Sequence, residues 1–217
     1  MPRLTGVSKK DVSGTIAKYY QALFGDRDPV KEPGTATGTP GNWWTVFAKV
    51  PYIFDHATSH FGMFGMFSDK SVSQLDPLAR ELGILRAGYT QGSQFVFSQH
   101  CKAARDVGLS EAQVEAIPAW TVSDLFSGEE RAVLAYVDEL VLQNGRVQDA
   151  TFENLRVHLS EEEILELSYI TALYEMHAIL SRALRLEFDD VEERVVEIPE
   201  PSASPGTDFM GGVGRTD

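Results

Sequence analysis

The stretch that decides the fold is LDPLARELGILRAGYTQGSQFVFSQHCKAARDVGLSEAQVEAI, residues 75–117. Asp76 followed by Pro77 is typical of a helix start, because aspartate caps the first turn and proline fits the first helical position. Gly92 is expected to end this helix, and a second helix is expected to cover about 93–107. Because the connection at Gly92 is short, the sequence predicts an antiparallel helical hairpin.

Two polar residues on the inner faces of this hairpin are candidates for chemistry. His100 lies near the centre of the apolar face of the second helix, and Glu81 lies at the border of the apolar stripe of the first helix. A carboxylate that accepts the proton of one imidazole nitrogen fixes the tautomer and makes the other nitrogen more basic, as general acid-base catalysis requires. The alternative is a core histidine that a neighbouring group satisfies.

The rest of the chain is also expected to be helical, so the predicted fold class is all-α. Apolar residues recur at three- and four-residue steps, and no segment shows the alternation of a strand. Capping signatures occur at Ser110 with Gln113, Ser127 with Glu130, and Ser160 with Glu163. The further helices are expected at about 12–24, 127–143, 149–158 and 161–187, with Pro51 splitting the aromatic segment 42–67 into two short helices.

Three segments are expected along the chain. Residues 1–41 form an N-terminal helix and a loop, and residues 42–196 form the main helical domain. Residues 197–217 are rich in proline, glycine and serine, so we expect a flexible tail or an arm on a neighbouring subunit.

Charge and cysteine content exclude several classes of function. The 217 residues carry 32 acidic and 19 basic side chains, and the net charge of -13 disfavours nucleic acid and anionic membranes as partners. No apolar run approaches the roughly 20 residues that span a bilayer. We therefore expect a cytoplasmic protein. Cys101 is the single cysteine, so the chain has neither an internal disulfide nor a C-x-x-C pair.

Residues 75–117 resemble the central motif of the carboxymuconolactone decarboxylase and alkyl hydroperoxidase D superfamily. In that motif an R-E-L helix leads to a histidine helix that ends in A-x-x-x-G-L-S. The stretches FSGEERAVLAYVDEL (126–140) and LSEEEILELSYITALYEMHAILSRAL (159–184) also look like the longer members of that superfamily. The resemblance implies an alkyl hydroperoxidase D-like helical bundle, a homo-oligomer that is a trimer or a hexamer, and no metal.

One departure from the family pattern separates its branches. The peroxidase branch has a glutamate, a C-x-x-C pair and a histidine four residues after the second cysteine. Glu81 and His100 match, whereas Ser93 and Val96 occupy the two cysteine positions. Thiol-based peroxide reduction needs an attacking and a resolving thiol, so disulfide cycling is excluded at this motif. Cys101 points about 100° away from His100 on the helix and is read as a small hydrophobe, with a solitary reactive thiol as the alternative.

The resemblance therefore implies a cofactor-independent enzyme of the decarboxylase type. His100 would transfer a proton and Glu81 would orient it, during decarboxylation, isomerisation or hydrolysis of a small organic acid or lactone. Two alternatives stay open: an alkyl hydroperoxidase D-like peroxidase or oxidoreductase, and a non-catalytic protein of the same fold that binds a small ligand.

Further residues are candidates for binding the substrate. They are Tyr89, Ser93, Val96 and Phe97 in the hairpin, and His56, His60, Tyr174 and His177 elsewhere. Packing in the core is the alternative for each histidine. The four-residue spacing of His56 and His60 also suits two metal ligands, but no H-E-x-x-H pattern or acidic cluster accompanies them, so we expect no metal site.

Overall fold

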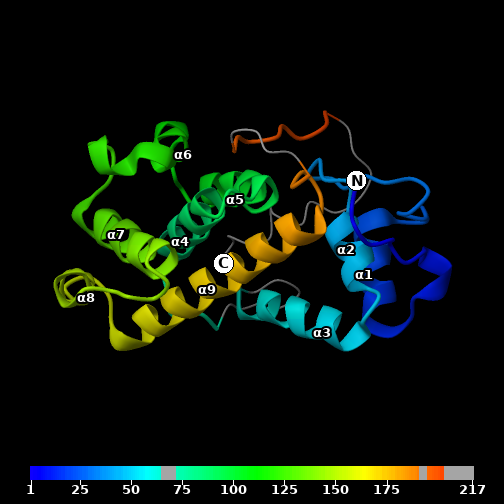
Figure 1. Cartoon of the computed structure of the whole chain (residues 1–217), viewed down its shortest axis with the longest axis horizontal. Helices are drawn as coiled ribbons and strands as arrows, with labels where there is room; N and C mark the ends of the chain where they lie inside the picture. Colours follow the sequence, from blue (N-terminus) through cyan, green and yellow to red (C-terminus); the bar gives the residue numbers. More distant parts are fainter. Residues whose placement is uncertain (65–71, 191–194, 203–217) are drawn as a thin grey trace. The chain divides into compact units, whose positions relative to one another are not determined.

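A computed structural model describes residues 1–64, 72–190 and 195–202 (Figure 1). Every regular element within these ranges is an α-helix or a 3-10 helix, which confirms the predicted all-α class. The chain divides into two compact units. The central unit comprises Ser73–Leu180 and residues 195–197, and the terminal unit comprises the other described residues. The segments 1–41, 42–196 and 197–217 stay a prediction, and residues 203–217 lie outside the described part.

Helix α4 (Pro77–Thr90) is the middle element of the central unit. It packs against α5 (Gln94–Asp106), its partner in the predicted hairpin, and against α7 (Gly128–Leu142) (Figure 1). Ten consecutive residues of α4, from Ala79 to Gly88, are buried, so the helix is covered on all sides. The unit also contains α6 (Glu111–Ala116), the 3-10 helix η3 (Ile117–Val122), α8 (Asp149–Arg156) and most of α9 (Glu161–Leu184).

Two glycines allow neighbouring helices to approach α4 closely. A Cβ atom on Gly83 would lie 2.9 Å from Thr171 Oγ1 of α9, and one on Gly88 would lie 2.8 Å from Val96 Cγ1 of α5. Both distances are shorter than van der Waals contact, so a larger residue at either position would push a helix away. The two glycines therefore fix the spacing of α5 and α9 around α4.

The helices begin at the predicted capping residues. The Asp76 side chain accepts a hydrogen bond from the backbone N–H of Leu78 at 2.7 Å, at the start of α4. Reciprocal side-chain and backbone bonds begin α6, α7 and α9 at Ser110 with Gln113, Ser127 with Glu130, and Ser160 with Glu163. These bonds satisfy backbone groups that a helix start otherwise leaves unpaired.

The predicted end of the last helix was wrong. Helix α9 ends at Leu184 rather than at 187, because Arg185 and Glu187 adopt left-handed conformations with φ of 53° and 48°. A right-handed helix cannot continue through such residues. Neither residue is a glycine, so the sequence lacks the usual stop signal. No helix in the described residues is both long and apolar enough to cross a membrane.

Residues 195–197 lie along α5 in the central unit. The Gln94 side chain accepts a hydrogen bond from the Val196 N–H at 2.9 Å and donates one to the Val196 carbonyl. The Glu197 carboxylate accepts two hydrogen bonds from Arg105, at 2.6 and 2.5 Å. The segment is thus fixed near both ends of the helix that carries His100.

Aromatic side chains form the core of the terminal unit. Its elements are η1 (Lys9–Asp11), α1 (Gly14–Phe24), α2 (Asn42–Phe47), α3 (Pro51–Ser59) and η2 (His60–Phe64). Pro51 begins α3, so it divides the aromatic segment as predicted, and residues 65–67 of that segment lie outside the described part. The rings of Trp43, Trp44, Phe47 and Phe54 contact one another with centroid distances of 4.2 to 6.4 Å.

A buried carboxylate fixes the start of α2. Glu187 accepts hydrogen bonds from the backbone N–H groups of Gly41 and Trp43, at 2.9 and 2.6 Å. Burial raises the pKa of Glu187 to about 7, and the charge of Asp189 adds to this effect, although the two N–H donors act in the opposite direction. Glu187 therefore changes its charge near neutral pH.

An ion pair between α4 and α7 supports the central unit. Arg86 binds Asp138 through two hydrogen bonds of 2.5 and 3.1 Å and donates a third to the Ile117 carbonyl. The Trp120 indole N–H donates to the same aspartate at 2.9 Å. The side chains of Arg86 and Asp138 are only 10% and 19% exposed.

Replacing Asp138 with alanine should lower the free energy of unfolding by about 3 kcal/mol, because Arg86 and Trp120 would keep buried donors without this acceptor. Urea denaturation followed by far-UV circular dichroism measures this change. Glu153→Ala is the control, because it removes a surface pair with Arg156 at 3.4 Å and should change stability little. Equal stability of Asp138→Ala and the wild type would contradict the structural role of the pair.

Glu187→Gln should reduce the pH dependence of the terminal unit's stability. The pKa of Glu187 is about 7 in the folded chain, above its ordinary value of 4.5. Its contribution to the free energy of unfolding is therefore complete below pH 4.5 and is lost as the pH rises through about 7. Glutamine has no such titration. Fluorescence of Trp43 and Trp44 in a Trp120→Phe background reports unfolding of this unit at each pH. Identical pH profiles for the two proteins would contradict the prediction.

Candidate active site

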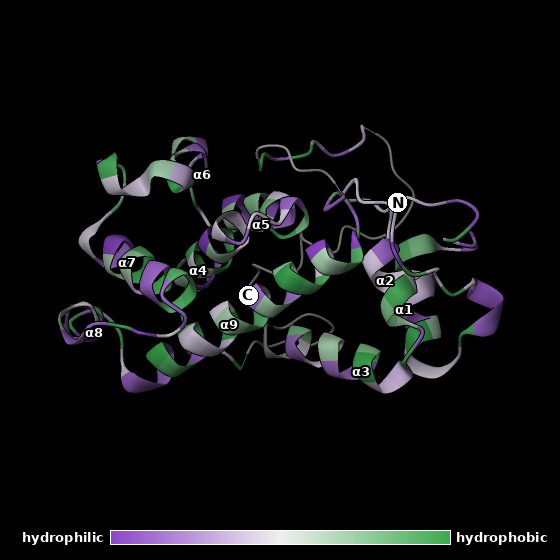
Figure 2. Ribbon diagram, in the orientation of Figure 1, coloured by the Kyte–Doolittle hydropathy of each residue, from purple (hydrophilic) through white to green (hydrophobic). Residues whose placement is uncertain are grey.

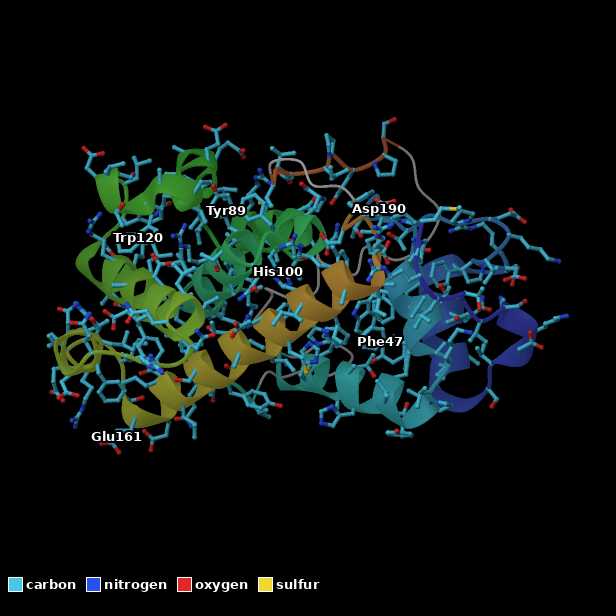
Figure 3. All side chains as sticks on the ribbon, viewed as in Figure 1. Phe47, Tyr89, His100, Trp120, Glu161 and Asp190 are labelled. Carbon is cyan, nitrogen blue, oxygen red and sulfur yellow. The ribbon has the colours of Figure 1, made fainter. Side chains whose placement is uncertain are left out.

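Glu81 and His100 meet in the interior of the central unit. Helix α4 carries Glu81 and α5 carries His100, and the distance from Glu81 Oε2 to His100 Nδ1 is 2.7 Å. The two side chains are 0% and 4% exposed. Figure 3 shows His100 on α5 on the side of α9. The hairpin therefore brings together the two residues that the sequence singled out. Since Nδ1 is held by the carboxylate, Nε2 is the nitrogen suited to exchange a proton with a substrate.

Arg80 occupies the second oxygen of the same carboxylate. Its Nε atom lies 3.1 Å from Glu81 Oε1, and the Arg80 side chain is 1% exposed. Burial raises the pKa of Glu81, but the charges of His100 and Arg80 and their hydrogen bonds outweigh this effect and hold the pKa below its ordinary value. Glu81 is consequently an anion at neutral pH, with a positively charged group beside it.

A second carboxylate, Glu166 of α9, fixes the segment before α4. It accepts hydrogen bonds from the Ser73 hydroxyl and from the backbone N–H groups of Gln74 and Leu75, at 2.5 to 3.1 Å. Burial raises the pKa of Glu166, but these three donors and the charge of Arg80 bring it below the ordinary value. Helix α9 thus holds the start of the helix that carries Glu81.

Two aromatic side chains of α9, Tyr174 and His177, lie beside the His100 imidazole in a row. The Tyr174 ring meets the His100 imidazole edge-on, with a centroid distance of 4.5 Å and an interplanar angle of 83°. The His177 ring lies 5.8 Å from the Tyr174 ring. Burial and the nearby Glu81 charge raise the pKa of Tyr174, so its phenol keeps its proton at neutral pH. Tyr174, one of the predicted substrate-binding residues, is thus in contact with His100.

The remaining hairpin candidates make contacts with one another. The Tyr89 and Phe97 rings are 5.7 Å apart, and Val96 is buried against Gly88. The Ser93 hydroxyl accepts a hydrogen bond from the Val96 N–H at 3.2 Å, which makes Ser93 the N-cap of α5. The substrate-binding roles of these residues stay predictions.

Cys101 has the character of a packed hydrophobe. Its side chain is fully buried, and burial, with a further contribution from the charge of Glu197, raises its pKa to about 12. A thiol with so high a pKa is almost entirely protonated near neutral pH and is therefore a poor nucleophile. This environment agrees with the interpretation of Cys101 drawn from the sequence.

His56 and His60 belong to the terminal unit. His56 is exposed at the end of α3, whereas His60 is buried with its ring 4.1 Å from that of Phe61. The described residues contain no group of three or more side chains able to hold a metal ion. The role of His56 and His60 in binding the substrate stays a prediction.

A cavity of about 210 Å³ lies elsewhere in the central unit, between the first turns of α4 and α7. Ala79, Leu82 and Glu130 are among its lining residues, and neither Glu81 nor His100 lines it. It is therefore a different feature from the substrate space expected beside His100. That space stays a prediction.

Sequence analysis missed Arg80 and Glu166 as parts of this site. Arg80 is quoted in the R-E-L motif, and a charged residue inside a strongly apolar helix is a signal for a buried ion pair. Glu166 has no comparable signal, because its partners lie more than ninety positions earlier in the chain.

The comparisons with known proteins agree with the architecture. The model of the carboxymuconolactone decarboxylase family matches residues 56–139. The uncharacterized protein YdfG of Bacillus subtilis is 30% identical over 99 residues, which cover 45% of this chain and 67% of that protein. The uncharacterized protein YnjA of Escherichia coli is 28% identical over 163 residues, 75% of this chain and 83% of that protein.

Solved structures share the fold. A protein of unknown function from Agrobacterium tumefaciens, whose description links it to the antioxidant defence protein AhpD, is 25% identical with a TM-score of 0.58, over 70% of this chain and 96% of that one. A peroxidase-related protein from Ralstonia eutropha with an alkylhydroperoxidase AhpD core is 16% identical, with a TM-score of 0.67. The match covers 92% of this chain and 98% of that one. The debrominase Bmp8, solved as a cysteine-to-alanine variant with 2,3,4-tribromopyrrole, is 16% identical, with a TM-score of 0.62. The match covers 88% of this chain and 94% of that one.

The helical hairpin, the quoted motif and these matches lead to one conclusion: the chain belongs to the carboxymuconolactone decarboxylase family, within the superfamily that includes the AhpD-like proteins.

Proposed function

We propose that the protein is an enzyme that acts on a small organic acid or lactone by general acid-base chemistry, without thiol redox steps. The observation that carries this proposal is the buried contact of 2.7 Å between His100 Nδ1 and Glu81 Oε2. A histidine oriented by a carboxylate is the usual arrangement for proton transfer near neutral pH. The family supports the proposal, because its name is that of a decarboxylase.

The proposed roles follow from the contacts of each residue. Glu81 holds the Nδ1–H group of His100, and Arg80 keeps Glu81 ionised. In a decarboxylation, the bond to the carboxylate carbon breaks, carbon dioxide leaves, and the electron pair stays on the substrate as an enolate. The protonated His100 then donates its Nε2 proton to the substrate carbon from which carbon dioxide left. In an isomerisation or a hydrolysis, Nε2 would accept a proton before returning it.

The peroxidase alternative rests on the neighbours with peroxidase-related descriptions. It is disfavoured because Ser93 and Val96 stand at the positions of the two family cysteines, and because Cys101 is buried with a raised pKa. A non-catalytic protein that binds a small ligand is the third possibility, since folds are retained when activities are lost. The cytoplasmic location and the trimeric or hexameric state also stay predictions.

His100→Gln should lower turnover at least roughly 100-fold, because glutamine keeps a polar side chain of similar size but cannot carry a proton between substrate and solvent. The assay is loss of substrate from a panel of small carboxylated lactones, beginning with carboxymuconolactone, the compound in the family's name. The matched control is His158→Gln, which changes an exposed histidine. If wild type and His100→Gln turn over the same compound at equal rates, the assignment to His100 is wrong.

The wild type should not consume hydrogen peroxide or an organic hydroperoxide faster than the background reaction with dithiothreitol. Cys101→Ser should behave identically, because the buried thiol takes no part in the proposed chemistry. Peroxide loss followed spectrophotometrically measures both rates. Catalytic peroxide consumption that disappears in Cys101→Ser would support the peroxidase alternative and contradict the present proposal.

A further inference from the structure

The Glu81–His100 pair lies beside a third buried ionisable side chain, that of Arg80. Arg80 Nε lies 3.1 Å from Glu81 Oε1, while His100 Nδ1 lies 2.7 Å from Oε2 of the same carboxylate. The Arg80 side chain is 1% exposed. A carboxylate and an imidazole alone can compensate each other by sharing a proton, so their hydrogen bond does not explain why an arginine is buried with them. Because a guanidinium stays charged at any ordinary pH, its charge is what it adds to the pair. Figure 2 shows the mixed hydropathy of α4 and α5, the two helices that carry these residues.

The charge of Arg80 changes which protonation state of His100 is compensated. Without Arg80, the Glu81 carboxylate would carry a lone negative charge whenever the imidazole is neutral, so the interior would favour the imidazolium form. With Arg80, the charges of guanidinium and carboxylate cancel, and a neutral imidazole leaves no net charge on the three side chains. A further proton then adds a positive charge to a buried site. Glu81 can thus orient the ring without also holding a second proton on it.

We propose that Arg80 is a positioning residue that keeps Nε2 of His100 free to accept a proton near neutral pH. It acts through Glu81 and does not itself touch the substrate. The role rests on the proposed function, in which Nε2 exchanges a proton with a small organic acid or lactone. In an isomerisation, for example, Nε2 takes the proton of a C–H bond, and the electron pair of that bond stays on the substrate as an enolate.

Three ionisable side chains of α9 lie near this cluster. Tyr174 meets His100 edge-on, and burial raises the pKa of its phenol, which is therefore uncharged near neutral pH. The His177 ring lies next to Tyr174, with 5.8 Å between the ring centroids. Glu166 is close enough to Arg80 for their charges to interact, but its hydrogen bonds go to the segment before α4. Arg80 is thus the permanent positive charge at the carboxylate that orients His100.

The charged groups of α5, α6 and the segment 195–197 form a separate network. Its ion pairs have distances of 2.5 to 3.8 Å and join Lys102, Arg105, Glu111 and Glu197. Two cations and two anions compensate one another there, so the network adds little net charge at His100. The protonation of His100 is therefore expected to respond mainly to its own carboxylate and to Arg80.

The first experiment follows the titration of His100 by NMR in the whole chain, without substrate. The chain has five histidines, and His100→Gln identifies the His100 ring signal of histidine-labelled protein by its loss. Arg80→Gln should raise the pH midpoint of this signal by at least about one unit, which is roughly tenfold tighter proton binding, because the carboxylate loses its permanent counter-charge. An unchanged midpoint would overturn the proposal.

Arg86→Gln is the matched control. Arg86 is also a buried arginine of α4, but its carboxylate partner is Asp138 of α7. This variant should lower stability while it leaves the His100 midpoint within about 0.3 pH units of the wild type, because it does not contact Glu81. If Arg86→Gln shifts the midpoint as much as Arg80→Gln does, the effect is a general consequence of a weakened α4 and the proposal is wrong.

A second pair of variants decides the question if Arg80→Gln does not fold. Glu81→Gln should lower the His100 midpoint, because Arg80 then acts on the imidazole without an intervening anion. The double variant, Arg80→Gln with Glu81→Gln, buries neither charge, and its midpoint should lie about one unit above that of Glu81→Gln alone. Equal midpoints in these two proteins would show that Arg80 has no influence on His100.

Kinetics distinguishes this inference from the proposed function. On a substrate that the wild type turns over, Arg80→Gln should move the acidic limb of kcat/KM to higher pH by the same amount as the NMR midpoint. Arg80→Lys keeps the positive charge and should restore most of the wild-type pH profile. A limb that does not move with the NMR midpoint would overturn the role of Arg80 in proton transfer. Absence of any wild-type turnover would instead overturn the proposed function, whereas the titration needs no substrate.

Discussion

The charge of Glu81 is the constraint on which the central unit depends. Burying a lone carboxylate costs several kcal/mol, so the chain must supply compensating groups in the interior. His100 and Arg80 do so, one at each carboxylate oxygen. This requires α4 and α5 to pack at one register, which the close approach at Gly88 maintains. The architecture and the candidate chemistry therefore have the same physical origin.

Local signals made most of the fold predictable from the sequence. The starts of α4, α7 and α9 follow from residues that bond to backbone groups within three positions, so their effect does not depend on distant parts of the chain. The end of α9 was mispredicted because Arg185 and Glu187 take conformations that neither residue favours intrinsically. Glu187 gains two backbone hydrogen bonds there, from groups more than a hundred positions away, and no local pattern encodes such a gain.

The candidate site shows the same division between local and distant information. Glu81 and His100 were predicted to meet because a short connection forces two amphipathic helices into contact. Arg80 was overlooked because adjacent residues on a helix project about 100° apart and seldom share a partner. In the structure its side chain nevertheless reaches the carboxylate of its neighbour. The edge-on contact of Tyr174 with His100 depends on how α9 packs, which sequence periodicity alone does not determine.

Charge balance connects this packing to the kind of ligand that the site suits. The charges of Arg80 and Glu81 cancel, so the three side chains Arg80, Glu81 and His100 together are neutral when His100 is neutral and carry one positive charge when His100 is protonated. The protein as a whole has a net charge of -13, which repels anions at long range, but screening confines that repulsion to roughly 10 Å. A small carboxylate that reached His100 would therefore meet no net negative charge from Arg80, Glu81 and His100, whereas Glu166 lies at the segment before α4. Without Arg80, the same carboxylate would face the uncompensated anion of Glu81, and this difference is the electrostatic argument for an acidic substrate.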